Sequence, residues 1–327
     1  MLRLLLRPNG EGPRTNGTTF VTHHAPTLLL TLTCLLAGCS RSDRASVVAY
    51  VAQDQVYAEP ILHEFTRQTG IDVRTVFDSE AVKTVGLANR LLAERAHPQC
   101  DVFWGNEELR THQLAAQKVF RETDPWQAMG YRSRRLVINT NFLKAADVPA
   151  TLPGLTNSAW RGKIALAYPL FGTTATHFMA LRQSWGDAAW TAWCKALQAN
   201  QPLLVDGNSV VVKMVGRGEA WLGLTDSDDI AAGRREGLPV EALPLAGDSL
   251  LIPNTVAVIR SAPHPGAAQK LFAYLQSAEV LGQLVQKNAL EGKSAHETGV
   301  ATLKVNWADL VRDLDAATAK LKEIFMR

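Results

Sequence analysis

From Ser46 onward, short runs of β-branched and apolar residues alternate with helical patterns of about 10 to 15 residues. This alternation is typical of βαβ units, in which helices cover the faces of a parallel sheet. The first strand is predicted at residues 47–51. The next helix is expected to have Pro60 in its first turn, where a missing N–H is tolerated, and to end at Gly70. The pattern predicts an α/β fold with doubly wound, mostly parallel sheets.

Two series of such units follow one another, separated by a segment rich in proline and glycine at residues 149–162. The length of 327 residues is about twice that of a usual single domain, which also favours two lobes. We expect the first lobe to comprise residues 46–137 plus 255–287, and the second residues 138–254 plus 288–327. The last helix carries an apolar stripe, more typical of a core face than of a partner site, formed by Leu310, Leu314, Ala317, Leu321 and Ile324.

The most apolar run, residues 28–38, is about half as long as a membrane-spanning helix. It ends in Leu36-Ala37-Gly38-Cys39, which resembles the lipobox of bacterial lipoproteins. The resemblance implies a signal peptide at residues 1–38, lipidation of Cys39, a tether at residues 39–45 and attachment to a membrane through the lipid. The alternative is a buried segment that contains these four residues by chance.

The formal net charge is +3, from 34 basic and 31 acidic residues, and the signal segment carries most of the excess. Because the sequence has no long basic run and no nucleic-acid motif, we expect no binding to nucleic acid. Export would permit a disulfide between Cys100 and Cys194, but the sequence leaves their pairing open. We expect a monomer.

Polar residues follow each predicted strand. In open α/β sheets, ligands bind at the carboxyl ends of the strands, so we expect a ligand site there, between the lobes. The candidate ligand-binding residues are Asp54, Ser79, Glu80, Asn106 and Glu107 in the first lobe, and Gly172, Thr173, Thr174, Asn208, Ser209, Thr225 and Asp226 in the second.

Each of these loops also suits a simpler role, because Asp, Ser, Thr and Asn commonly cap helices. The turn at Gly172 is the better candidate for an anion site, since backbone N–H groups and hydroxyls can both face a ligand there. From Asp226 to Asp229, three carboxylates lie within four residues. Their repulsion must be relieved by a cation, by a basic group of a ligand or by solvent. Together these groups predict an acidic cleft.

Signals for catalysis are weak. The run Gly247-Asp248-Ser249-Leu250 matches the GDSL string of some esterases, but no Asp-x-x-His follows it. The histidines lack the spacing of a zinc site, and the sequence contains no Walker or dinucleotide glycine motif. We therefore expect neither an enzyme nor a cofactor. An exported hydrolase that uses Ser249 is the alternative of another class.

Six segments of the sequence follow one another in a characteristic order, at residues 50–54, 64–73, 101–104, 135–139, 218–224 and 254–258. Together they resemble the solute-binding proteins of iron(III)-type ABC importers. The resemblance runs from about residue 46 to 287 and implies a periplasmic-binding fold, with two lobes joined by crossing strands at residues 135–139 and 253–258. It further implies a protein of the periplasm, anchored by lipid, that delivers its ligand to an ABC permease in the inner membrane.

In that family, a histidine or glutamate of the first lobe and two tyrosines of the second hold ferric iron, and a synergistic anion lies at a helix N-terminus. Residues 172–174 match the anion turn, whereas Asp54 stands in place of the histidine and residues 225–227 in place of the tyrosines. Carboxylates and hydroxyls suit a hard cation, so Asp54, Glu107 and Asp226 are the predicted metal ligands. The predicted cargo is ferric iron, or a related hard metal, with a synergistic anion. The alternative cargo is an aminoalkylphosphonate or another small phosphorus oxyanion or zwitterion.

Overall fold

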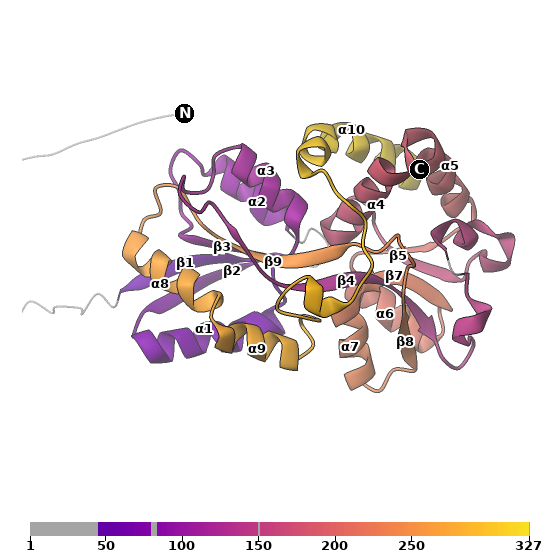
Figure 1. Cartoon of the computed structure of the whole chain (residues 1–327), viewed down its shortest axis with the longest axis horizontal. Coiled ribbons are helices and arrows are strands. Elements are labelled where there is room, and N and C mark those ends of the chain that lie inside the picture. The colour runs from indigo at the N-terminus through magenta and orange to yellow at the C-terminus, as the bar shows by residue number, and fades with distance from the viewer. Residues whose placement is uncertain (1–44, 80–83, 150, 327) are drawn as a thin grey trace, which may run out of the picture. The chain divides into compact units, whose positions relative to one another are not determined.

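The computed structural model describes residues 45–79, 84–149 and 151–326. Nine strands form one mixed sheet in the order β2-β1-β3-β9-β4-β7-β5-β6, and β8 pairs with β4 outside this path (Figure 1). The strands are β1 (Ser46–Val51), β2 (Asp72–Phe77), β3 (Val102–Gly105), β4 (Gln127–Asn139), β5 (Ile164–Ala167), β6 (Leu203–Val205), β7 (Leu222–Asp226), β8 (Val240–Leu243) and β9 (Leu251–Val258). The α-helices are α1 (Gln55–Thr69), α2 (Val85–Ala93), α3 (Glu108–Ala116), α4 (Gly172–Trp185), α5 (Asp187–Ala199), α6 (Asn208–Arg217), α7 (Ser227–Arg235), α8 (Pro265–Leu275), α9 (Ala278–Gln286) and α10 (Trp307–Phe325).

The sheet has two halves, and three strands within each half run parallel to one another. β1 pairs in parallel with β2 and β3, and β5 pairs in parallel with β6 and β7. We call the first half, with α1–α3, α8 and α9, the first lobe, and the second half, with β8, α4–α7 and α10, the second lobe (Figure 1). The prediction of an α/β fold with two doubly wound lobes is confirmed.

The two lobes are joined by β4 and β9. β9 lies antiparallel to β3 of the first lobe, and the part of β4 from Gln127 to Ser133 pairs with β9. The next part, from Arg134 to Ile138, pairs with β7 of the second lobe. This change of partner places Arg132 and Arg134 at the junction of the lobes. Crossing strands were expected at residues 135–139 and 253–258. The second range lies in β9, whereas the part of β4 that pairs with β9 precedes the first range. The exact lobe boundaries given above stay predictions.

Each lobe buries its own core. Phe65 of α1 and Trp104 of β3 are fully buried in the first lobe, as are Phe178 of α4 and Trp190 of α5 in the second. The apolar stripe of α10 packs into the core of the second lobe, so its prediction as a core face is confirmed.

The two cysteines of the described chain do not pair. Cys100 lies in a core cluster of the first lobe and Cys194 in that of the second, and both are buried free thiols. Burial raises the pKa of each thiol, so both stay protonated at neutral pH.

The helices differ from the expectation in two places. α1 begins at Gln55, so Pro60 lies inside the helix rather than in its first turn. The carbonyl that a proline leaves without its helical donor is four residues earlier, at the highly exposed Val56, where water can reach it. The segment after Asp226, expected to be a loop, forms α7, because acidic residues are favoured in the first turn of a helix by its dipole.

Residues 1–44, which hold the predicted signal peptide, Cys39 and nearly all of the tether, lie outside the described residues, as does Glu80. Within the ranges that the structure describes, no helix is both long and apolar enough to cross a bilayer.

Candidate functional site

A cavity lies between the lobes, at the carboxyl ends of the parallel strands. Its volume is about 30 Å³, enough for a few water molecules or a small ion. Seven of the twelve predicted residues line it. The complete lining is Asp54, Asn106, Arg132, Ala167, Tyr168, Phe171, Gly172, Thr173, Thr174, Asp206, Gly207, Asn208, Asp226, Asp228 and Asp229.

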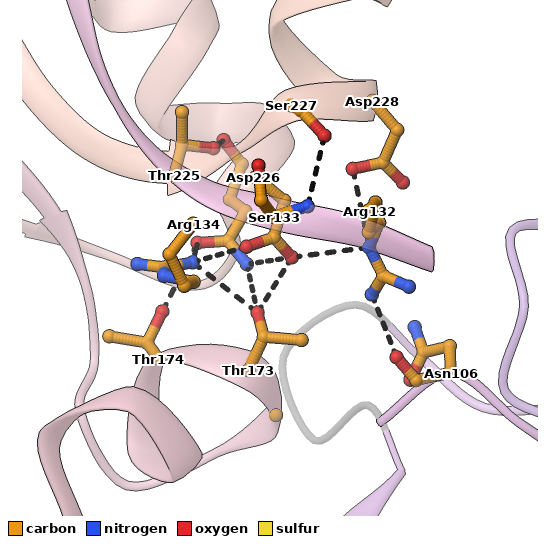
Figure 2. Close-up of polar contacts among 12 residues, drawn as sticks. Asn106, Arg132, Ser133, Arg134, Thr173, Thr174, Thr225, Asp226, Ser227 and Asp228 are labelled. Carbon is orange, nitrogen blue, oxygen red and sulfur yellow. Dashed lines mark hydrogen bonds and ion pairs between the residues drawn. The ribbon is translucent and has the colours of Figure 1, made fainter. Parts of the chain in front are cut away.

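Arg134 and Asp226 form a buried ion pair at this cavity. Arg134 Nη1 donates to Asp226 Oδ1 at 2.6 Å, and both side chains are almost inaccessible to water (Figure 2). The hydroxyl of Thr173 donates to Asp226 Oδ2 at 2.7 Å, and Asn208 Oδ1 accepts from Arg134 at 3.0 Å. Burial alone would raise the pKa of Asp226, but Arg134 and Arg132 outweigh it and hold the pKa below its usual range. The charge of Asp226 is therefore neutralised by the protein itself.

Arg132 spans the junction of the lobes. Its Nε lies 3.5 Å from a carboxylate oxygen of Asp226 and 3.3 Å from one of Asp228, both in the second lobe. Its Nη2 donates to the backbone carbonyl of Asn106 in the first lobe at 2.8 Å (Figure 2). Burial would lower the pKa of this guanidinium, but the surrounding carboxylates, that of Asp228 foremost, raise it above its ordinary value. Part of the repulsion that the sequence predicts among the acids is thus relieved by a basic group of the chain.

Four of the five acids at the cavity come from two helix N-termini that belong to different lobes. Asp226 is the N-cap residue of α7, and Asp228 and Asp229 lie in its first turn. One carboxylate oxygen from each of these three lies within 4.8 Å of the others. Asp54, the N-cap residue of α1, lines the same cavity from the first lobe. The arrangement offers several anionic oxygens to one small cation.

Two further helices of the second lobe begin at the cavity. α4 starts at Gly172, whose φ of 53° lies in the left-handed region that favours glycine, and α6 starts at Asn208. The hydroxyl of Thr174 donates to Asn208 Oδ1 at 3.1 Å, and Asn208 Nδ2 donates to Thr173 Oγ1 at 2.8 Å. The backbone N–H groups of these first turns carry partial positive charge, which suits an anion.

Glu107, a predicted metal ligand, lies outside the cavity lining. Its carboxylate accepts from the backbone N–H groups of Leu109 at 2.7 Å and Arg110 at 2.9 Å, and so caps α3. The hydroxyl of Thr176 on α4 donates to the same carboxylate at 2.9 Å, which links the two lobes. Burial raises the pKa of Glu107. In this structure Glu107 acts as a helix cap and as a contact between the lobes.

Three other predicted residues, Ser79, Ser209 and Thr225, are not part of the cavity lining. The hydroxyl of Thr225 donates to the backbone carbonyl of Asn208 at 3.0 Å, and Ser79 is exposed just after β2. Their part in ligand binding stays a prediction.

Sequence reasoning missed the two arginines of β4. The available signal was the run Arg132-Ser133-Arg134-Arg135, an unusual density of arginine directly before the apolar end of a strand. Tyr168 and Phe171, which also line the cavity, carry no comparable signal.

The structure gives Ser249 a structural role. Its hydroxyl is buried and donates to the backbone carbonyl of Arg134 at 2.7 Å. Nε2 of the buried His177 lies 2.6 Å from the backbone carbonyl of Asp248, to which the Nε2–H tautomer donates. Neither side chain lines the cavity, so the hydrolase alternative gains no support.

The buried side chain of His177 is expected to make the protein less stable in acid. Burial lowers its pKa from 6.5 to about 3, so between these pH values the unfolded chain binds a proton that the native protein does not. Stability therefore falls as the pH decreases, by about 2 kcal/mol at pH 5 relative to neutral pH for this group alone. Urea unfolding of wild type and His177→Gln at pH 7 and pH 5 measures this difference. Equal pH dependence in the two proteins would contradict the assignment.

The model of the family described as bacterial extracellular solute-binding protein matches residues 46–287. An Fe(3+)-binding periplasmic protein of Serratia marcescens is 28% identical over 219 residues, which cover 61% of this chain and 62% of that protein. The alignment thus spans less than two thirds of the length of that relative. The major ferric iron-binding protein of Neisseria meningitidis serogroup A is 25% identical over 261 residues, which cover 72% of this chain and 77% of that protein.

Among solved structures, iron-bound HitA from Pseudomonas aeruginosa superposes with a TM-score of 0.75 at 19% identity and covers 86% of this chain and 99% of that one. At this identity the likeness supports the fold alone. The matched range of the family model is the range over which the six sequence segments show their resemblance. Because the family model matches residues 46–287, and because the chain has a two-lobed fold, the chain belongs to the family of bacterial extracellular solute-binding proteins.

Proposed function

We propose that this protein captures ferric iron with a synergistic anion between its lobes and delivers the iron to the permease of an ABC importer. The observation that carries the proposal is the convergence of Asp226, Asp228 and Asp229 at the cavity that Asp54 lines from the other lobe. Anionic oxygens are the ligands that hard cations prefer. The curated relatives, which are named for ferric iron, support the same cargo.

The charge of the cavity supports a cation over a phosphorus oxyanion. Among the described residues, Arg132 is the one guanidinium in the lining, against five carboxylates. A phosphonate dianion would therefore meet net negative charge, and the relatives named above do not favour it. The five carboxylates are those of Asp54, Asp206, Asp226, Asp228 and Asp229.

The contacts of Asp226 suit an organising role better than direct ligation. Its oxygens accept from Arg134 and Thr173, and a metal would compete with these donors. We therefore assign metal binding to Asp54, Asp228 and Asp229. The first turn of α4, beginning at Gly172, is the proposed place of the anion. In the set of metal ligands expected from the sequence, Asp228 and Asp229 thus take the places of Glu107 and Asp226.

We further propose that the mature protein is a monomer of the periplasm, anchored to a membrane by lipid on Cys39. The lipobox sequence and the periplasmic relatives support this location. Mass spectrometry of Cys39 in protein from the cell envelope tests the anchor.

Elemental analysis and titration test the cargo. We expect the purified protein to carry iron, and the iron-free protein to bind one ferric ion per chain from ferric citrate. A ligand at 100 times its dissociation constant should stabilise the protein by about 2.7 kcal/mol, so thermal unfolding with ferric citrate, phosphate and 2-aminoethylphosphonate separates the candidates. Stabilisation by the phosphonate without any by iron would overturn the proposal.

A further inference from the structure

On one flank of the cavity, Arg235 of the second lobe makes two hydrogen bonds to the first lobe. Its Nη2 donates to the phenolic oxygen of Tyr57 on α1 at 2.6 Å, and its Nη1 donates to the backbone carbonyl of Lys287 at the end of α9 at 2.9 Å. Figure 1 shows α9 between α1 and α7 on this flank. One guanidinium thus holds two elements of the facing lobe.

The two partners differ in burial. Tyr57 is 6% exposed and packs in the first-lobe core, so its hydroxyl has a fixed position. Arg235 is exposed on the last turn of α7, where a positive charge is favoured by the helix dipole. When the lobes separate, a long solvated side chain can leave Tyr57 without stranding a buried charge. Such a contact can form and break with closure.

Both helices that meet at this contact begin at the cavity. α7 carries Asp228 and Asp229 in its first turn and Arg235 at its end, six to seven residues and about 10 Å away. α1 has Asp54 as its N-cap residue and Tyr57 within its first turn. A rigid shift of α7 toward α1 therefore brings the carboxylates and Arg235 to their partners together.

We propose that Tyr57 and Arg235 form a latch that holds the lobes closed and thereby slows release of the ligand. For the identity of the ligand this inference rests on the proposed function; the latch itself does not. The apparent dissociation constant rises as the closed fraction of the protein falls. Removal of a hydrogen bond from a charged donor should reduce that fraction about tenfold.

Two variants remove the latch from opposite sides. Tyr57→Phe deletes the accepting oxygen and keeps the ring, and Arg235→Met deletes the guanidinium and keeps the apolar stem. Arg234→Met is the matched control, because Arg234 lies on the same turn of α7 and makes no hydrogen bond to the first lobe among the described residues. The double variant should show no larger effect than Arg235→Met alone, because Arg235→Met removes the bond to Tyr57 as well as the bond to the Lys287 carbonyl.

The first readout requires no ligand. Spin labels at Glu59→Cys on α1 and Lys213→Cys on α6, both exposed positions, report the distance between the lobes. Within the described residues the native thiols are those of Cys100 and Cys194, which are buried and protonated, so labels in this part of the chain should attach only at the new sites. In iron-free protein we expect longer distances in both latch variants than in wild type and in Arg234→Met. Unchanged distances would overturn the latch.

The second readout is binding of ferric citrate. We expect about tenfold weaker binding in each latch variant, through faster dissociation, and unchanged binding in the control. If wild type binds no iron, the proposed function fails, and the distance measurement still decides on the latch. If wild type binds iron but the variants match it in affinity and dissociation rate, the latch has no part in release and that half of the inference falls.

Discussion

Replacement of Asp226 by alanine is expected to lower the free energy of unfolding by about 3 to 5 kcal/mol. The carboxylate is buried between Arg134 and Arg132, and its removal leaves Arg134 without its charged partner at 2.6 Å. A buried guanidinium without a counter-charge is far more destabilising than the pair is stabilising, so the loss should exceed what one surface ion pair contributes. Urea unfolding at neutral pH, in the absence of iron, measures it.

Two further variants separate the buried pair from the general acidity of the cavity. Asp206→Ala removes a carboxylate that lines the same cavity but is exposed, and should change stability little. The double variant Arg134→Met with Asp226→Leu replaces the pair by apolar groups of similar size and should recover part of the loss. A loss below about 1 kcal/mol for Asp226→Ala would contradict the role assigned to the pair.

The course of the chain through the two lobes could be predicted from local patterns. Residues 47–51 were expected as a strand and form β1 (Ser46–Val51), because a short apolar run rich in β-branched residues favours a strand. The convergence of Asp54, Asn106 and Gly172 was also expected, because it follows from the topology of parallel strands rather than from the residues themselves.

The arginines of β4 could not be predicted in the same way. Charged residues in a strand ordinarily indicate an exposed face, and a buried arginine is stable only beside an acid. For Arg134 that acid is Asp226, 92 residues later in the chain. Local sequence contains no information on such a pair until the sheet order is known. The same pairing changes the predicted acidic cleft into a site whose buried acid is already neutralised.

Glu107 illustrates a different limit. A glutamate that lies directly before a helix, at the carboxyl end of a strand, can serve equally well as a metal ligand or as a helix cap. The distinction depends on Thr176, which lies 69 residues away and donates to the carboxylate from the other lobe. Residue type and loop position predict that a side chain will be near a site, whereas its partners decide what it does there.

The double variant Asp228→Asn with Asp229→Asn is therefore expected to lose at least about 100-fold in affinity for ferric iron. Substitution of groups that only orient a metal ligand typically weakens metal binding 10- to 100-fold, and two direct ligands should have a larger effect. Asparagine keeps the size of each side chain and removes the charge that a hard cation prefers. Competition with a chelator of known affinity measures the constant, and urea unfolding confirms that the variant is folded.

Glu107→Gln is the decisive comparison, because the sequence and the structure assign that residue differently. Its carboxylate caps α3 and accepts from Thr176, so the substitution should lower stability by about 0.5 to 2 kcal/mol while one ferric ion still binds per chain. If iron binding is lost in Glu107→Gln and retained in Asp228→Asn with Asp229→Asn, the ligand set expected from the sequence is right and the one assigned from the cavity is wrong. If iron binding is instead retained in Glu107→Gln and lost in the double variant, the metal lies at the first turn of α7. This is the helix that also carries Arg235.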